Sequence, residues 1–214
     1  MATKTEVKIE ETLGDNLVTL AEYYRGTEKN LLAVCRTIDL ETLKGLKQLK
    51  EKPLLFTQEE LISGVDVFPI DFLNIKEHHR ILYGEDFLKD LKISKGNLRH
   101  QLEFEFRSKL IHLRREFLQF KGKGLDNLIL SAVPALMPII GGLICLKDLG
   151  YDDTQDLFKV VSDGYGINVQ VLKEIYEIRQ GRSKFKKDKE YYIKELIRVL
   201  TEIGKIIDDF KVME

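Results

Sequence analysis

Asp71 is the first side chain in this sequence whose position suggests chemistry, because it interrupts an apolar run. Residues Val67–Leu73, VFPIDFL, are short and apolar with Pro69 near the start, a pattern that predicts a buried β-strand. A carboxylate is costly to desolvate in such a strand. We therefore expect Asp71 to be paired, to lie at a strand end, or to point into a functional site.

Histidines and arginines offer a second kind of chemistry, acid–base catalysis or metal binding. His78 and His79 are adjacent, so on a helix their side chains diverge by about 100° and make poor joint ligands. We expect them to form a polar surface pair after the strand. Arg107 and His112 fit the R-x4-H pattern of HEPN-type ribonucleases, but the pattern is short and its helix is rich in arginine. We favour a solvated helix face for this second pair.

The composition is that of a globular protein without a strong charge bias. The chain has 214 residues, of which 43% are hydrophobic and 32% charged, and its net charge is −1. This length is enough for one large domain or two small ones, each with a core. The charge balance gives no strong signal for a nucleic-acid partner or for an anionic membrane surface.

The cysteines and the N-terminal residues favour a cytoplasmic protein. Cys35 and Cys145 lie in apolar stretches without metal-ligand spacing, so we expect reduced core cysteines. The first residues, MATKTEVKIEETLG, contain no apolar signal core.

Leu128–Leu146 is an uncharged run of 19 residues, which is long enough to span a bilayer. Pro134, Pro138 and the pair Gly141-Gly142 would interrupt a lone spanning helix, and the flanks show no aromatic anchors. A buried, kinked core helix is the interpretation that we favour, with a membrane span as the alternative.

The first half of the chain predicts helices and strands joined by short turns. Asp39 is a plausible N-cap for an amphipathic helix over Asp39–Lys50, and Thr57 with Glu60 forms a capping-box pattern. Arg25–Asn30, RGTEKN, is a turn-rich link between strands. The remaining predicted elements are a helix at Val7–Leu13 and strands at Leu17–Tyr23, Leu31–Cys35 and Leu54–Phe56.

The second half, from Ser94 onward, predicts helices only. Apolar residues recur every three or four positions over a long stretch, which indicates one helix with a core stripe; they are Leu98, Leu102, Phe106, Leu110, Leu113, Phe117 and Phe120. Shorter helices are predicted at Thr154–Asp163 and Asn168–Gln180, and a final helix carries apolar residues from Ile193 to Phe210. Short connections between such helices favour an antiparallel bundle. We predict an α+β protein with a mixed-sheet domain at 1–90 and a helical bundle at 91–214.

With this order of elements, the chain resembles the nucleotidyltransferase superfamily, the fold of DNA polymerase beta and kanamycin nucleotidyltransferase. The match is most specific over Pro53–Leu91, PLLFTQEELISGVDVFPIDFLNIKEHHRILYGEDFLKDL, and the long helix that follows. Within that superfamily, the chain is most similar to the bacterial and archaeal proteins described as predicted nucleotidyltransferases. The resemblance implies a small mixed sheet, a Gly-Ser turn that receives nucleotide phosphates, and carboxylates on neighbouring strands that bind Mg²⁺.

This sequence departs from the family pattern at the phosphate and metal positions. Where the Gly-Ser turn belongs, the chain has Leu20-Ala21-Glu22-Tyr23, and where D-x-D belongs it has Glu28-Lys29-Asn30. Within the resemblance, Asp71 matches the third acidic position, Glu28 is a possible anionic ligand, and Asn30 offers a neutral carbonyl. Loss of one well-placed electrostatic group in a catalytic site typically costs about two to three powers of ten in rate.

Three hypotheses for function follow from the resemblance. The favoured one is a degenerate nucleotidyltransferase that has lost catalysis and acts as a binding, regulatory or scaffold module for a nucleotide, an anion or a protein. The second is an active enzyme that uses Glu28 and Asp71 with one Mg²⁺ and Asn30 as a neutral ligand. The third is a structural protein that forms a homodimer through an exposed face of the bundle. The resemblance also makes His79 and Arg80 candidates to line a cleft between the domains.

Overall fold

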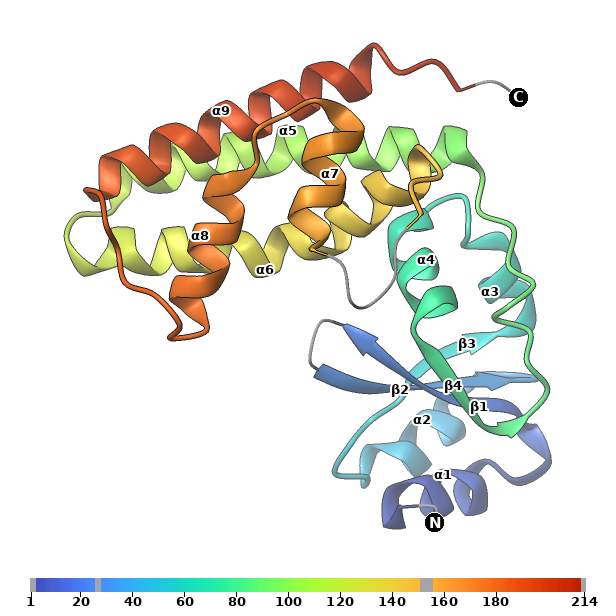
Figure 1. The fold of residues 1–214 in the computed structure, drawn as a ribbon. Helices are drawn as coiled ribbons and strands as arrows, with labels where there is room; N and C mark the ends of the chain where they lie inside the picture. Colours follow the sequence, from blue (N-terminus) through green and yellow to red (C-terminus); the bar gives the residue numbers. More distant parts are fainter. Residues whose placement is uncertain (1–2, 26–27, 151–155, 213–214) are drawn as a thin grey trace. The chain divides into compact units, whose positions relative to one another are not determined.

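The computed structural model describes residues 3–25, 28–150 and 156–212. Helices account for 61% of the chain and strands for 13%, with a sheet in the N-terminal part and helices after it, which confirms the predicted α+β class. The chain divides into two compact units, Met1–Ser94 and Lys95–Glu214. Figure 1 shows the elements of both units in chain order.

The first unit is built around a mixed β-sheet. Among the described residues the sheet has four strands in the order β3-β2-β1-β4. β1 pairs antiparallel with both β2 and β4, and β2 pairs parallel with β3. The strands are β1 (Leu17–Arg25), β2 (Glu28–Cys35), β3 (Leu54–Thr57) and β4 (His79–Gly84).

The first three strands confirm the predicted ones, but β1 and β2 are longer than expected. The predicted link over Arg25–Asn30 is wrong at both ends, because Arg25 belongs to β1 and Glu28–Asn30 belong to β2. Cross-strand pairing continues as far as Arg25 opposite Glu28. The middle of that link, residues 26–27, lies outside the described residues.

Helices α1 (Lys4–Leu13) and α2 (Leu40–Lys47) cover one face of the sheet, and both confirm predicted helices. Thr3 and Glu6 form a capping box at the start of α1, and the Asp39 carboxylate accepts a 2.8 Å hydrogen bond from the Thr42 backbone N–H at the start of α2. Their buried side chains share one hydrophobic cluster with the strands, formed by Ile9, Leu13, Leu17, Leu20, Leu31, Ala33, Cys35, Leu46 and Leu49.

Helices α3 (Gln58–Ser63) and α4 (Pro69–Glu77) cover the other face, as Figure 1 shows. The predicted capping box of Thr57 and Glu60 is confirmed at the start of α3. A second hydrophobic cluster fills this side and consists of Ala21, Leu32, Val34, Leu61, Val65, Phe72, Ile75, Leu88 and Leu91. The first unit is therefore a three-layer arrangement with the sheet in the middle.

The predicted strand at Val67–Leu73 is wrong, because this segment enters helix α4. Pro69 occupies the first turn of the helix, where its missing N–H costs nothing and its fixed φ favours helix formation. Ile70, Phe72, Leu73 and Ile75 are buried while Asp71 is exposed. An apolar run of seven residues is too short for its period to distinguish a buried strand from a buried helix.

The fourth strand, β4, begins at His79, which the sequence predicted to form a polar surface pair with His78. His78 is exposed, but the His79 side chain is only 9% exposed, so that prediction is wrong for His79. The strand follows α4 directly and ends at Gly84, which has a φ of +79°. A Cβ atom at Gly84 would lie 2.0 Å from the carbonyl oxygen of Val18, so no other residue fits here without movement of the backbone. Gly84 therefore allows β4 to end close against β1.

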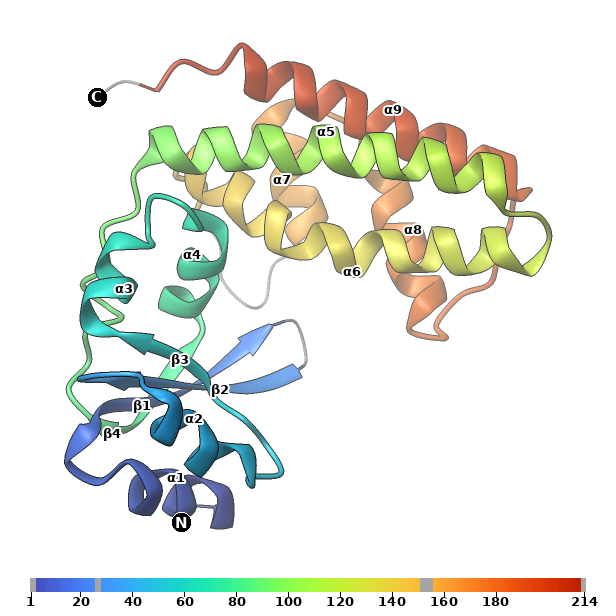
Figure 2. The ribbon, with the colours of Figure 1, turned by 180° about the vertical axis from the view of Figure 1, so that it is seen from behind.

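The second unit is a helical bundle, formed by α5 (Lys95–Gln119), α6 (Lys123–Leu146), α7 (Leu157–Tyr165), α8 (Gln170–Arg179) and α9 (Lys189–Asp208). The long helix predicted from the core stripe is α5, which packs against α6 and α9 (Figure 2). The prediction is wrong for Phe120, because α5 ends at Gln119 and Phe120 is 40% exposed. Asn168–Gln180 and the final helix are also confirmed as α8 and α9. The predicted start of a helix at Thr154 lies outside the described residues, which begin again at Asp156.

Helix α6 contains the long apolar run and both of its prolines. Because Pro134 has no N–H, the Leu130 carbonyl loses its usual helical partner, and Arg179 from α8 donates to it instead at 3.2 Å. Within the described residues α6 is the one helix whose length and composition would allow it to cross a membrane, and half of its most apolar window is buried inside the bundle.

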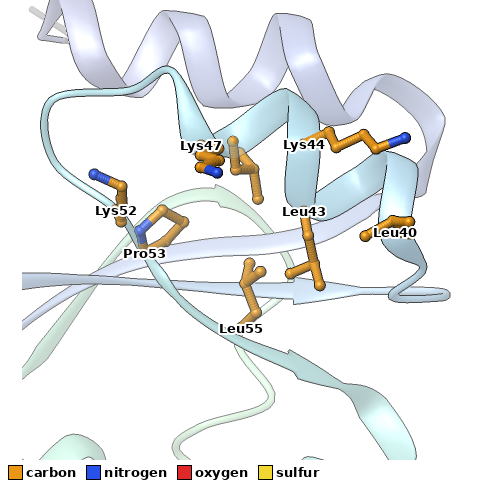
Figure 3. A pocket seen from close by; sticks show the side chains of 8 residues that line it. Leu40, Leu43, Lys44, Lys47, Lys52, Pro53 and Leu55 are labelled. Atoms are coloured by element: carbon orange, nitrogen blue, oxygen red, sulfur yellow. The ribbon is translucent and has the colours of Figure 1, made fainter.

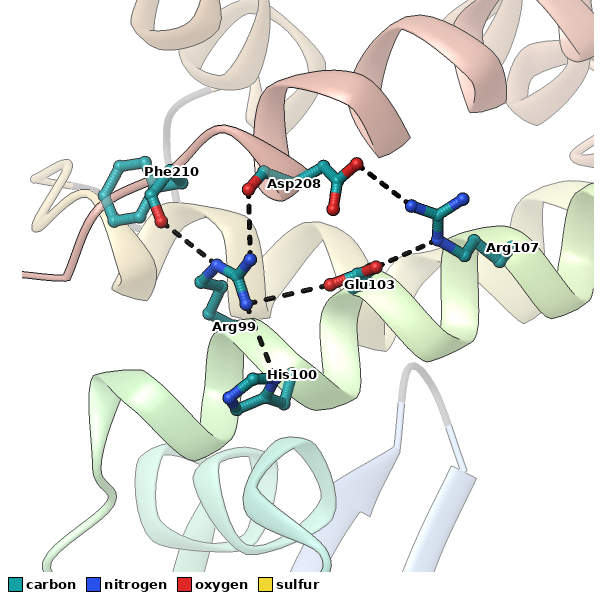
Figure 4. Close-up of polar contacts among 6 residues, drawn as sticks. All are labelled: Arg99, His100, Glu103, Arg107, Asp208 and Phe210. Atoms are coloured by element: carbon teal, nitrogen blue, oxygen red, sulfur yellow. Dashed lines mark hydrogen bonds and ion pairs between the residues drawn. The ribbon is translucent and has the colours of Figure 1, made fainter.

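An arginine network fastens the end of α9 to α5 (Figure 4). Arg99 donates to the Phe210 carbonyl and to the Asp208 carbonyl, both at 3.0 Å. Arg107 pairs with Glu103 at 3.0 Å and with the Asp208 carboxylate at 3.1 Å. Arginines at a helix C-terminus satisfy its last carbonyl groups and favour the negative end of the helix dipole.

Candidate functional site

The three residues proposed as metal ligands lie on a strand and on a helix. Glu28 is exposed at the start of β2, and the Asn30 amide donates to the Glu28 backbone carbonyl at 3.1 Å. Strand alternation puts these two positions on one face of the sheet. Asp71 is exposed on α4 rather than on a strand as predicted. Across residues 3–25, 28–150 and 156–212, no group of three or more His, Cys, Asp or Glu side chains has an arrangement that could hold a metal ion.

The His79 side chain connects the last turn of α4 to Asp86, which follows β4. Its Nδ1 lies 3.1 Å from the Ile75 carbonyl and 2.9 Å from the Lys76 carbonyl, and its Nε2 lies 3.1 Å from Asp86 Oδ1. Burial opposes ionisation of Asp86, but hydrogen bonds from the Lys89 backbone N–H and from His79 outweigh it and lower the pKa of this carboxyl group. His79 therefore helps to hold the end of α4 in place.

Arg80 belongs to an ion-pair network around the buried carboxylate of Glu22, which we call the Glu22 network. Glu22 is 3% exposed, and Arg80 lies directly opposite it on β4 with Nε 2.8 Å from Oε1. Lys29 from β2 forms an ion pair with the other Glu22 oxygen and lies 3.5 Å from Glu6 of α1. The network thus joins α1 and three strands.

The two cations keep Glu22 ionised although it is buried. Hydrogen bonds from Arg80 and then from Lys29 outweigh the desolvation penalty and lower the pKa of Glu22 to about 2. The same contact with Glu22 raises the pKa of Lys29. Sequence reasoning missed this network, because Glu22 and Arg80 are 58 positions apart and meet only through strand pairing. The one available signal was a glutamate between the apolar residues Leu20-Ala21 and the aromatic residues Tyr23-Tyr24.

The segment expected to replace the Gly-Ser turn lies inside β1. Ala21, Glu22 and Tyr23 pair with Leu32, Leu31 and Asn30 on β2, and on the other side with Ile81, Arg80 and His79 on β4. In a strand with neighbours on both sides, the backbone N–H groups are used by the ladders. These N–H groups are therefore not arranged as a turn around an anion.

A separate apolar groove, which we call the α2/β3 groove, lies between α2 and the edge strand β3 (Figure 3). Its volume is about 490 Å³, and it is lined by Leu40, Leu43, Lys44, Leu46, Lys47, Lys52, Pro53 and Leu55. Leu43 and Leu55 extend toward each other from the two elements, while Leu40 and Leu43 remain 65% and 47% exposed. The groove is therefore an exposed apolar surface with three lysines around it.

No family model, curated protein or solved structure matches this chain.

Proposed function

We propose that this protein is a non-catalytic binding module built on a degenerate nucleotidyltransferase-like unit. The observation that carries the proposal is the course of β1 through Leu20–Tyr23, where the resemblance requires a phosphate-binding turn. A nucleotide triphosphate needs free N–H groups and positive charge at that place. The chain has a continuous strand there, with the ionised carboxylate of Glu22.

The α2/β3 groove is the surface that we propose for the partner. Leu40, Leu43 and Leu55 supply apolar contact area, and Lys44, Lys47 and Lys52 add positive charge at its margins. β3 stands at the edge of the described sheet, so an added strand has a neighbour with which to pair. The partner is therefore an extended segment of another protein in which apolar and acidic side chains alternate.

Calorimetric titration with ATP and GTP, with and without Mg²⁺, tests the loss of nucleotide chemistry. We expect no metal-dependent binding. The competing hypothesis is an active enzyme, and the observation in its favour is that Glu28 and Asn30 share one face of the sheet. Mg²⁺-dependent nucleotide binding that disappears in Asp71→Asn would establish that hypothesis and overturn ours.

Fluorescence anisotropy tests the groove, with a labelled eight-residue peptide in which leucine and glutamate alternate. We expect the protein to bind this peptide more tightly than a peptide in which leucine and lysine alternate. Leu43→Asp should weaken binding by roughly tenfold, since it puts a charge into the apolar lining. Ile62→Asp is the matched control, because Ile62 is 70% exposed on α3 and does not line the groove. Equal binding of both peptides, or loss of binding in both variants, would refute the assignment.

A further inference from the structure

Helix α5 carries a line of large apolar side chains on the side that faces away from its own core. Phe104 and Ile111 are each 66% exposed and Leu118 is 84% exposed. Leu98, Leu102, Phe106 and Leu113 of the same helix are buried. At 3.6 residues per turn, the exposed residues lie about 180° from the centre of the buried face. We call them the α5 stripe.

The spacing of the α5 stripe is that of a heptad repeat. Its members are seven residues apart, and successive members drift by only about 20° around the helix. The stripe is therefore straight and narrow, and it extends for about 21 Å along the helix. In Figure 2, α5 runs in front of α9 and above α6, so its outer side is not covered by these two helices. Such a line can lie along the apolar face of a second helix whose apolar residues recur at the same spacing.

The surroundings of the stripe are basic. Within about 60° of its centre the polar neighbours are Asn97, His100, Arg107, Ser108, Arg114 and Arg115, with no acidic residue among them. The whole helix has six basic and three acidic residues, although the chain as a whole has a net charge of −1. The stripe is therefore an apolar line in a positively charged face.

The acidic residues of α5 offset only part of this charge. Glu103 and Glu116 pair with Arg107 and Arg115 of the basic face, but the two carboxylates are more buried than the arginines. Glu103 lies 3.0 Å from Arg107, Glu105 lies 3.3 Å from Lys109, and Glu116 lies 3.5 Å from Arg115. Their side chains are 16–26% exposed, against 57% for Arg107 and 65% for Arg115. The guanidinium groups thus remain the more accessible charges.

We propose that the α5 stripe docks an acidic amphipathic helix of a partner protein, with apolar residues at heptad spacing and glutamate or aspartate beside them. A second copy of this chain fits less well, since two stripes would bring arginines against arginines. An anionic membrane fits less well too, because one large apolar residue per seven gives a line rather than the broad apolar face that inserts into lipid.

The full-length protein and two labelled synthetic helices test this proposal. Both peptides have four heptads with leucine at positions a and d; one has glutamate and the other lysine at positions e and g. We expect the acidic peptide to bind and the basic peptide to bind at least tenfold more weakly. Ile111→Ser should weaken acidic-peptide binding by roughly tenfold. Ile62→Ser is the matched control, because Ile62 is 70% exposed on another helix, and it should leave binding unchanged.

A charge-reversal pair separates the basic face from the stripe itself. Arg114→Glu with Arg115→Glu should abolish the preference for the acidic peptide, while Lys194→Glu, an exposed lysine on α9, should not. Equal binding of the two peptides, or no binding of either, would overturn the proposal. So would a concentration-dependent dimer that Ile111→Ser dissociates, which would assign the stripe to a second copy. Binding to vesicles of anionic phospholipid that Ile111→Ser abolishes would assign it to a membrane.

Discussion

The Glu22 network in the sheet unit and the arginine network between α5 and α9 use the same chemistry in different surroundings. Each connects elements far apart in the sequence through carboxylate and cation side chains. In the Glu22 network the carboxylate is 3% exposed although its cations Lys29 and Arg80 are 39% and 68% exposed. In the arginine network both partners are exposed, since the side chains of Arg107 and Asp208 are 57% and 51% exposed. Burial removes water that would otherwise solvate the charges, so the same pairing is expected to matter more in the sheet than at the end of the bundle.

Lys29→Met should have, together with Glu22→Gln, the largest effect on stability. The change removes the cation between Glu22 and Glu6 and leaves the buried Glu22 carboxylate with Arg80 as its remaining cation in the network. We expect the free energy of unfolding of the sheet unit to fall by about 2 kcal/mol, less than the roughly 3–5 kcal/mol typical of a broken buried pair, because Lys29 is itself partly exposed. Native-state hydrogen exchange of the β1 amide groups measures this loss in the full-length protein.

Lys44→Met is the matched control for that change. Lys44 pairs with Glu41 at 2.7 Å, but the two side chains are 58% and 78% exposed. Its removal should leave the exchange of β1 unchanged within error. If the two lysine variants lost the same stability, burial would not be the property that distinguishes the networks.

Glu22→Gln should remove a pH-dependent contribution to stability. The folded-state pKa of Glu22 is about 2, below its ordinary value of 4.5, so its contribution is present above pH 4.5 and disappears as the pH falls toward 2. We expect the variant to be less stable at pH 7 by about 2 kcal/mol, after allowance for solvent screening. Urea unfolding at several pH values checks the sign, because the difference from the natural protein should shrink as the pH falls from 4.5. A difference that grows with acidity would contradict the assignment.

Arg99→Met tests the less exposed part of the α5–α9 network. The Arg99 side chain is 16% exposed and satisfies two carbonyl groups at the end of α9. Its loss should cost about 1 kcal/mol and increase hydrogen exchange in the last turn of α9. Lys194→Met, at an exposed position near the start of the same helix, should not change that exchange. An unchanged last turn in Arg99→Met would show that water replaces the guanidinium without loss.

Local signals in the sequence predicted much of the fold. Thr57 with Glu60 and Asp39 marked helix starts, because a capping side chain acts within three residues of its own position. The repeated spacing of Leu98 through Phe117 predicted α5, because a period measured over several turns is unambiguous. The apolar run before His78 was predicted as a strand but is part of α4, and β4 was not predicted, since neither segment is long enough to show its period.

The candidate site was harder to predict than the fold, because it depends on contacts between distant residues. Asp71 was placed on a strand from its apolar neighbours, whereas the structure puts it on the exposed side of α4. Glu22, Lys29 and Arg80 are brought together by the register of three strands, which no local pattern in the sequence specifies. Similarly, the α5 stripe has heptad spacing in the sequence, but its exposure depends on where α6 and α9 pack.

Arg107→Ala should have the smallest effect of these changes and is the sharpest test of the comparison. Arg107 contacts two carboxylates, those of Glu103 and Asp208, so a count of ion pairs alone would rank it with Lys29. Because these side chains are largely solvated, we expect the melting temperature to fall by about one degree at low ionic strength. At 1 M salt, where the Debye length is about 3 Å, the difference should vanish. A large loss that persists in high salt would mean that the exposed network stabilises the bundle as strongly as the buried one stabilises the sheet, and the role assigned to burial would then be wrong.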